Sequence, residues 1–329
     1  MRSTNARPAR RGLQGRDILS LADLSGAEVT TVLDAAARLK RAQGADLPHA
    51  LLPARTLGML FEKASLRTRT TFVVGMVHLG GQAVDLMAEH TQMGVRESVP
   101  DIARNLERWV DAVMARVYDQ NVLEELAEYS RVPIINGLSD RFHPCQVLAD
   151  LLTLRERLGS LAGRTLAYVG DGFNVCHSLM LGGALTGLHV RVGTPPGYEP
   201  DPEIVEQARR IARGSGGTIE LVSSAEAAVR NADAVYTDSW VSMGLEEERA
   251  ERLAAFAPFQ VNAALMAGAA SDAVFMHCLP AHRGEEVTDE VMDGPQSVVF
   301  DQAENRLHAQ KALLVLLVRG EAALEALPS

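Results

Sequence analysis

The segment Ser65-Leu66-Arg67-Thr68-Arg69-Thr70 places hydroxyl and guanidinium groups directly after an apolar run at residues 57–61. The residues that follow, 72–79, have a helical pattern. Hydroxyls, exposed backbone N–H groups and a guanidinium at the start of a helix can bind a phosphate group. A capped helix start with surface arginines would explain the segment equally well. By itself, the segment permits a phosphate site without requiring one.

A second polar group, His143-Pro144-Cys145-Gln146, opens another long helical pattern. An imidazole and an amide on adjacent turns can donate hydrogen bonds to one carbonyl oxygen. Taken alone, a structural histidine is the simpler interpretation. Arg116 lies near the end of the apolar run 112–117, and a charge at the end of a buried strand needs a partner. An anionic ligand could be that partner.

Three polar segments follow apolar runs in the second half of the chain. Gly170-Asp171-Gly172-Phe173-Asn174 is a glycine turn, but it lacks the G-x-G-x-x-G spacing of a dinucleotide site. The segment 238–244 (DSWVSMG) offers a carboxylate and a hydroxyl to a zwitterion. In His277-Cys278-Leu279-Pro280, the cysteine alone could be a small buried residue.

Near the end of the chain, Glu304-Asn305-Arg306 begins the last helix that we expect. An arginine in a first helical turn opposes the helix dipole, which suggests that it has a functional role. The expected helix runs from about residue 304 to residue 318 and is apolar enough to pack on the first domain.

Apolar runs alternate with longer helical patterns, which is typical of parallel α/β sheets. The first half has expected strands at 57–61, 83–86, 112–117 and 132–135. The second half has expected strands at 166–169, 189–192, 219–222, 234–237 and 274–277, with a further short strand at 298–300. Ser25 and Glu28 form a capping box that predicts the start of an early helix.

The chain has 329 residues, enough for two domains. We predict an α/β protein with two doubly wound parallel-sheet domains joined by interdomain helices, one of them at 143–157. The first domain would span 1–150, with the helix of 304–329 packed back on it, and the second would span 151–303. Ligands of open parallel sheets bind beyond the carboxyl ends of the strands, which predicts an active site between the domains.

Composition excludes several classes of function. The net charge of −10 argues against nucleic acid as a partner, and no apolar run is long enough to span a membrane. Three scattered cysteines favour reduced thiols and hence a cytoplasmic protein. The first sixteen residues contain five arginines, and we interpret them as a frayed tail rather than a transit peptide.

The motifs Ser-x-Arg-Thr-Arg, His-Pro-Cys-Gln, Asp-x-Trp-Val-Ser-Met-Gly, His-Cys-Leu-Pro and Glu-Asn-Arg occur here in that order. Together they resemble the motifs of ornithine carbamoyltransferases, over residues 16 to 317. The resemblance implies transfer of a carbamoyl group from carbamoyl phosphate to the side-chain amine of L-ornithine. The products would be L-citrulline and phosphate, in arginine biosynthesis. The resemblance implies neither a metal nor a cofactor.

The resemblance also implies roles for individual residues. Ser65, Leu66, Arg67 and Thr68 would bind the phosphate, and Arg116, His143 and Thr68 would polarise the carbamoyl carbonyl. Gln146 would hold the amino group. The carbamoyl phosphate site would further include Pro144, Cys145, Cys278, Leu279 and Arg306, with Gln92 reaching the site of a neighbouring subunit in a homotrimer. Asn174, Asp238, Ser242 and Met243 would bind ornithine. The catalytic residues would be Arg116, His143, Cys278 and Asp238.

Two positions depart from the pattern, Leu66 and Phe173, where many relatives have Thr and Asn. Phe173 adjoins Asn174 and bears on the shape of the acceptor pocket. Alternative hypotheses are a nicotinamide-dependent oxidoreductase, a catalytically inactive paralogue, and a carbamoyltransferase for putrescine or an acylated ornithine. The absent dinucleotide spacing, the intact motif residues and the Ser242-Met243-Gly244 segment, respectively, argue against these three.

Overall fold

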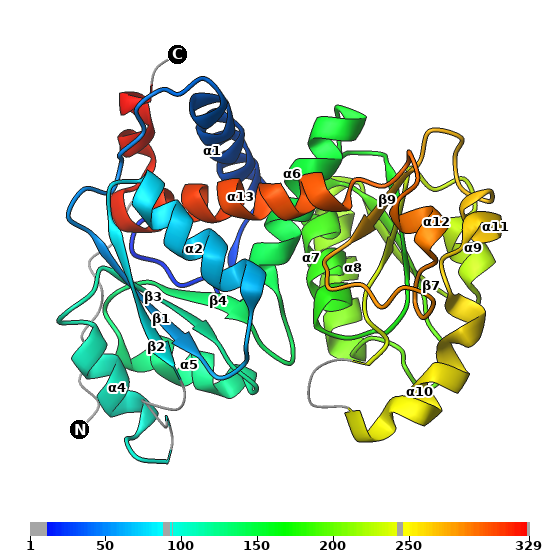
Figure 1. Ribbon diagram of the computed structural model, residues 1–329, viewed down its shortest axis with the longest axis horizontal. Coiled ribbons are helices and arrows are strands. Elements are labelled where there is room, and N and C mark those ends of the chain that lie inside the picture. The colour runs from blue at the N-terminus through cyan, green and yellow to red at the C-terminus, as the bar shows by residue number, and fades with distance from the viewer. Residues whose placement is uncertain (1–11, 88–92, 94, 242–245, 328–329) are drawn as a thin grey trace. The chain divides into compact units, whose positions relative to one another are not determined.

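The computed structural model describes residues 12–87, 93, 95–241 and 246–327, in two compact units (Figure 1). The first unit comprises residues 1–140 and 306–329, and the second comprises residues 141–305. Each unit has its own parallel β-sheet, which confirms the predicted class of two α/β domains. No helix in the described ranges has the length and apolar character needed to cross a membrane.

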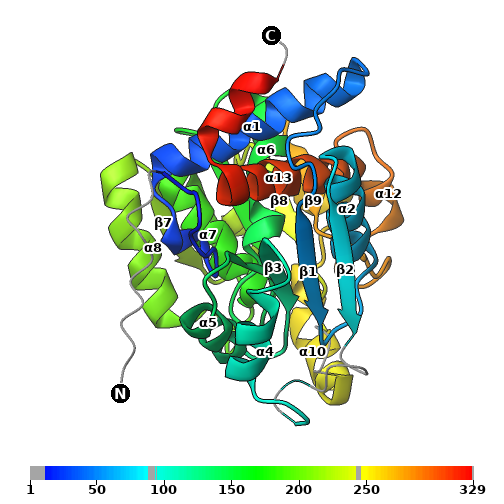
Figure 2. The ribbon, with the colours of Figure 1, turned by 90° about the vertical axis from the view of Figure 1, so that its left-hand side faces the viewer.

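The first unit has a four-stranded sheet in the order β2-β1-β3-β4. Its strands are β1 (Thr56–Phe61), β2 (Gln82–Met87), β3 (Ala112–Arg116) and β4 (Ile134–Leu138). Its helices are α1 (Gly26–Gly44), α2 (Leu66–His78), α4 (Val99–Leu106) and α5 (Gln120–Tyr129), with 3-10 turns at Leu21–Asp23 and Glu321–Ala326. Figure 2 faces this unit and shows β2 at the edge of the sheet beside β1. The predicted capping box of Ser25 and Glu28 does open α1.

The second unit has a five-stranded sheet in the order β7-β6-β5-β8-β9. Its strands are β5 (Thr165–Val169), β6 (His189–Gly193), β7 (Thr218–Val222), β8 (Ala234–Thr237) and β9 (Val274–His277). Its longer helices are α6 (Pro144–Leu158), α7 (Asn174–Thr186), α8 (Pro202–Ser215) and α10 (Arg249–Phe256). Shorter ones are α9 (Ala225–Val229), α11 (Ala263–Met266) and α12 (Asp289–Met292), with 3-10 turns at Glu246–Glu248 and Ala257–Phe259.

The last long helix, α13 (Val299–Arg319), contradicts two predictions. The short strand expected at 298–300 is wrong, because the chain makes only an isolated bridge between Ser297 and Phe275 before α13 begins. Arg306 is therefore the eighth residue of α13, not a first-turn residue. The effect of the helix dipole is confined to the first and last turns, so it does not bear on an arginine at the eighth position.

Strand β4 starts two residues later than expected and extends to Leu138. Its pairing with β3 shifts register between Ala115 and Arg116, as at a β-bulge. Gly137 lies in this irregular stretch, where an added Cβ would approach the Met114 Sδ to 2.5 Å. The side chain of Met114 thus occupies the space that any other residue at position 137 would need.

Candidate active site

In the first unit, the predicted phosphate segment forms the start of α2. Ser65 is the N-cap residue, and its Oγ accepts a hydrogen bond from the backbone N–H of Thr68 at 3.2 Å. Thr68 is buried, and its Oγ1 accepts from Arg306 Nη2 at 3.0 Å. Leu66 is 77% exposed, so its side chain packs against little of this unit. The structure thus brings Arg306 to the predicted phosphate segment.

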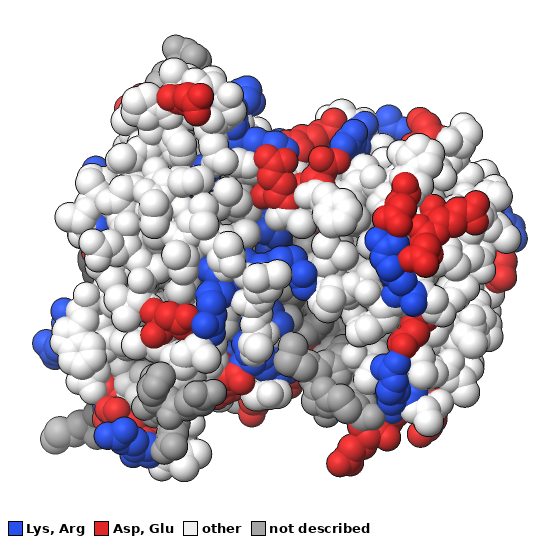
Figure 3. Space-filling view, viewed as in Figure 1, with Lys and Arg blue, Asp and Glu red and all other residues white. Residues whose placement is uncertain are grey.

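The two arginines that follow Ser65 differ in their surroundings. Arg69 forms an ion pair with Asp85 at 2.9 Å, and its guanidinium lies 4.7 Å from the centre of the Phe61 ring. Those contacts give Arg69 a structural role between α2, β1 and β2. Arg67 lies two residues earlier and is also half-buried. Figure 3 shows Lys and Arg side chains gathered over the start of α2 in this unit, a positive field suited to an anion.

Arg116 is the last residue of β3 and pairs in register with Phe61, the last residue of β1. Parallel neighbours end at the same sheet edge, so Arg116 lies beside the segment that leads to α2. Only 9% of its surface is exposed. Gln92, the residue expected to reach a neighbouring subunit, lies outside the described residues.

In the second unit, His143 is the N-cap residue of α6, and Pro144 occupies the first helical position, where its missing N–H costs nothing. The backbone N–H of His143 donates to Ser178 Oγ at 2.8 Å. His143, Cys145 and Gln146 are all buried. The Gln146 amide donates from Nε2 to Asp150 Oδ1 at 2.8 Å, one helical turn later. The hydrogen bonds to Ser178 and Asp150 therefore fix the motif at 143–146 in place, and neither partner could be identified from the sequence.

Two residues expected to bind the acceptor, and Cys278, which is expected at the carbamoyl group, come from three neighbouring strand ends. Asn174 follows β5, Asp238 follows β8 and Cys278 follows β9, and these strands are adjacent in the sheet. The Cys278 thiol donates to Asp238 Oδ1 at 2.9 Å. Leu279 has a left-handed φ of 59°, and its N–H donates to His277 Nδ1 at 2.8 Å. Ser242 and Met243 lie outside the described residues.

Sequence inspection missed an ion pair beside this strand end. Asp171, in the turn before α7, accepts from Arg252 Nη1 of α10 at 2.7 Å, and both side chains are buried. Burial raises the pKa of Asp171 to about 6, against the lowering effect of Arg252. Gly172 in the same turn has no room for a Cβ, which would lie 2.3 Å from the Pro200 nitrogen. The i,i+4 spacing of Glu248 and Arg252 was a signal only for their own ion pair.

Among the described residues, two groups of three could supply metal ligands: Asp238, His277 and Cys278, and His282, Glu285 and Glu286. His277 is poorly suited to this task. Its Nδ1 accepts from the Leu279 N–H, so its Nε2 carries the proton and donates to Glu286 Oε1 at 3.1 Å. Neither nitrogen then directs a lone pair toward Cys278.

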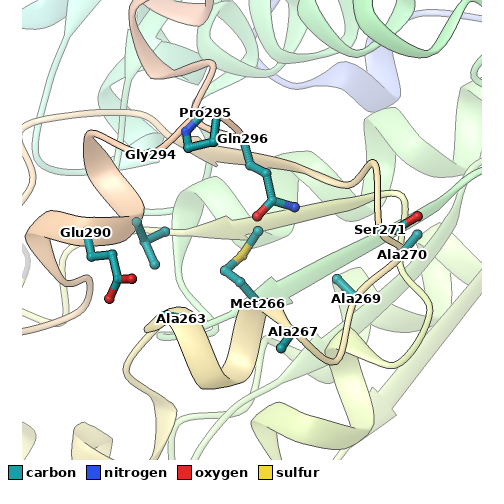
Figure 4. Close-up of a pocket in the computed structure, with 11 residues that line it drawn as sticks. Ala263, Met266, Ala267, Ala269, Ala270, Ser271, Glu290, Gly294, Pro295 and Gln296 are labelled. Atoms are coloured by element: carbon teal, nitrogen blue, oxygen red, sulfur yellow. The ribbon is translucent and has the colours of Figure 1, made fainter.

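A cavity of about 310 Å³ lies elsewhere in the second unit (Figure 4). Met266 and Gln296 point toward one another across it, and Glu290 lies at one side. Its lining includes residues 269–271, which precede β9, whereas His277 and Cys278 lie at the other end of that strand. The cavity is therefore remote from the chemistry-bearing residues of this sheet.

Comparisons with known proteins match both units. Residues 16–156 match the aspartate/ornithine carbamoyltransferase carbamoyl-P binding domain, and residues 162–317 match the Asp/Orn binding domain of the same proteins. The chain belongs to the aspartate/ornithine carbamoyltransferase family.

Relatives in this family include the ornithine carbamoyltransferase of Methanoculleus marisnigri, 55% identical over 93% of this chain and 97% of that protein. The ornithine carbamoyltransferase of Pyrococcus horikoshii is 54% identical over 94% of this chain and 97% of that protein. The solved structure of ornithine carbamoyltransferase from Pyrococcus furiosus has a TM-score of 0.92, with 53% identity, and covers 94% of this chain and 99% of that one.

Proposed function

We propose that this chain is an ornithine carbamoyltransferase, which transfers the carbamoyl group of carbamoyl phosphate to the side-chain amine of L-ornithine. The products are L-citrulline and phosphate. The observation that carries the proposal is identity above 50% over more than nine-tenths of the chain to proteins of that name. The motif residues that are expected to bind each of the two substrates are also present in the sequence.

For carbamoyl phosphate, the first unit supplies the start of α2, with the backbone N–H groups of Ser65, Leu66, Arg67 and Thr68 on the phosphate. Arg306 supports this proposal, because its hydrogen bond to Thr68 keeps a guanidinium at the same helix terminus. Arg116, at the end of β3, donates to the carbamoyl carbonyl oxygen. The proposal assigns the domain of residues 1–150, with 304–329, to carbamoyl phosphate.

The second unit supplies His143 as a further donor to that oxygen, and Gln146 as the residue that holds the amino group. Pro144 and Cys145 keep both at the start of α6, and Cys278 and Leu279 border the carbamoyl group. Negative charge develops on the carbonyl oxygen as the amine attacks, and each positioned donor typically contributes about 3–4 kcal/mol to lowering such a barrier. Phosphate leaves, and one of its oxygens can take the proton from the nitrogen.

Ornithine binds, in this proposal, to the domain of residues 151–303. Asn174, Asp238, Ser242 and Met243 hold its α-amino and α-carboxylate groups. The hydrogen bond between Cys278 and Asp238 supports an acceptor site here, because it places two polar groups together at adjacent strand ends. The reaction needs no metal or cofactor. The reduced thiols fit a cytoplasmic enzyme, and a Pyrococcus furiosus relative named as anabolic supports a role in arginine biosynthesis.

A homotrimer is part of the proposal, with Gln92 of one subunit completing the site of the next. An exposed apolar face in the first unit supports self-association: Leu66, Val73 and Val77 of α2 lie at helical spacing, near Val84 of the edge strand β2. Mixing inactive Gln92→Ala chains with inactive Arg116→Ala chains tests this. Shared sites should return part of the activity, whereas mixed chains that exchange and stay inactive would contradict it.

Formation of the carbamoylated product from carbamoyl phosphate and each of a panel of amines (citrulline in the case of L-ornithine) tests the reaction itself. The panel should contain L-ornithine, putrescine, N-acetylornithine and lysine. We expect turnover with L-ornithine above all the others, because the other amines change the α-amino and α-carboxylate groups or the chain length. Preferred turnover of putrescine or the acylated amine would replace the proposed acceptor, and no turnover with any amine would contradict the proposal.

A further inference from the structure

Asp150 of α6 is a buried carboxylate that was not among the predicted site residues. Its hydrogen bonds connect the motif at 143–146 with the motif at 277–280. Its exposed surface is 0%. Gln146 Nε2 donates to its Oδ1 at 2.8 Å, and Gln302 Nε2 of α13 donates to the same oxygen at 2.7 Å. The hydroxyl of Tyr236, on β8, donates to Oδ2 at 3.2 Å. Three donors thus meet one carboxylate.

The donor and the acceptor in each of these hydrogen bonds can be assigned, because some of the groups involved can only donate. The backbone N–H of His277 can only donate, and it donates to Gln302 Oε1 at 3.0 Å. Gln302 therefore turns its nitrogen toward Asp150. Burial, and the negative charge of Asp150, raise the pKa of Tyr236 well above its usual value, so its hydroxyl keeps its proton. Asp150 acts as an acceptor through both oxygens.

The hydrogen bond to Asp150 fixes the orientation of the Gln146 amide. With Nε2 directed to Asp150, the amide oxygen points to the other side. An oxygen accepts hydrogen bonds and cannot donate them, so it suits a ligand group that bears N–H bonds. The amino group of a carbamoyl phosphate is such a group, and the methyl group of acetyl phosphate is not.

We propose that Asp150 is a positioning residue that fixes the polarity of the Gln146 amide, so that the site selects a carbamoyl over an acetyl group. The inference rests on the proposed function for the role of Gln146 at the substrate. Through Gln302, the same carboxylate is connected to the backbone of His277, next to Cys278 on the acceptor side. Asp150 touches neither substrate in this proposal and acts only through its neighbours.

Asp150→Asn tests the proposal with little change in volume. Its amide can offer one accepting oxygen, and its nitrogen would face donors. Gln146 is then free to turn its own nitrogen toward the ligand. We expect the ratio of carbamoyl phosphate affinity to acetyl phosphate affinity to fall about tenfold, the effect of one lost hydrogen bond. If Asp150 had a structural role only, the substitution would weaken the binding of both ligands by the same factor and leave the ratio of affinities unchanged.

Titration calorimetry with each ligand alone measures this ratio without an acceptor. The result is therefore independent of whether ornithine is the natural acceptor, which the citrulline assay tests separately. An unchanged ratio in folded Asp150→Asn overturns the proposal, and so does a wild-type ratio near one. Should the asparagine variant fail to fold, Asp150→Ser removes the carboxylate without adding an amide nitrogen, and the same fall in the ratio is expected.

Two control variants separate this effect from the packing of α6 on α13. Thr153→Val removes the hydrogen bond between Thr153 Oγ1 and Asn305 Nδ2 at 2.9 Å, on the same pair of helices. It should lower stability and leave the ratio intact. Gln302→Leu keeps Asp150 in place, so it should raise the KM for ornithine more than it changes the ratio. A Thr153→Val ratio that falls like that of Asp150→Asn would also overturn the proposal.

Discussion

Lys311, on α13 in the first unit, is a buried lysine whose removal should stabilise the protein. Its ammonium donates to Gln43 Oε1 at 2.8 Å and to His49 Nε2 at 3.3 Å. The His49 Nδ1 lies 2.8 Å from the Leu47 carbonyl oxygen and so carries the ring proton. Both groups that accept from the ammonium, among the described residues, are therefore neutral. Burial lowers the pKa of Lys311 from 10.5 to about 8.

The size of the effect follows from this pKa. At about 1.36 kcal/mol for each pKa unit, the charged form costs up to about 3.4 kcal/mol more in the folded than in the unfolded chain. Gln43 and His49 are only half-buried, which screens part of the cost, and the substitution also removes two hydrogen bonds. For Lys311→Met, we expect a net gain of about 1–2 kcal/mol in the free energy of unfolding at pH 7.

Urea unfolding of the wild type and Lys311→Met between pH 7 and pH 10.5 measures both the sign and the size of the change in the free energy of unfolding. Below pH 8 the lysine is charged in both states, so the full cost is present in the wild type. Between pH 8 and 10.5 the unfolded chain binds more protons than the folded chain, so wild-type stability rises relative to that of the variant. The difference should therefore shrink over this range. A variant less stable than wild type at pH 7, or a difference independent of pH, would refute the reasoning. Lys40→Met, on the half-exposed Lys40 of α1, is the matched control.

Three further outcomes are expected. Arg116→Ala should reduce kcat by 100-fold or more, on the order expected for a lost oxyanion donor, while urea unfolding shows a smaller change; near-normal turnover would remove Arg116 from the catalytic residues. For Asp171, whose pKa is raised to about 6, the wild type should lose stability relative to Asp171→Asn as the pH rises from about 4 to about 7, because only the unfolded chain readily releases the proton; parallel stability curves would contradict this. We expect carbamoyl phosphate to bind before ornithine, so calorimetry should show that carbamoyl phosphate binds without ornithine, and tight ornithine binding to the empty protein would contradict this order.

The sequence by itself determined the class of fold and the positions of the polar motifs. Apolar runs separated by helical patterns are a local property, and nine of the ten expected strands lie where strands occur. The tenth, at 298–300, was apolar enough for a strand, but in the folded chain only Ser297 makes a bridge to Phe275 in this stretch, and α13 begins two residues later. The polar motifs were visible because charged and hydroxyl groups interrupt apolar segments at strand ends.

The contacts that hold those motifs were decided only by the tertiary structure. Gln146, Gln302 and His277 are separated by up to 156 residues, yet all of them connect to Asp150 directly or through Gln302. In the sequence, Asp150 is one acidic residue in a helical pattern, indistinguishable from a solvated one. Likewise, the lysine at position 311 has an ordinary pKa in an extended chain, and only burial against α1 and α2 lowers it. Local pattern sets which residues face a core, whereas desolvation and hydrogen-bond direction arise only when distant segments meet.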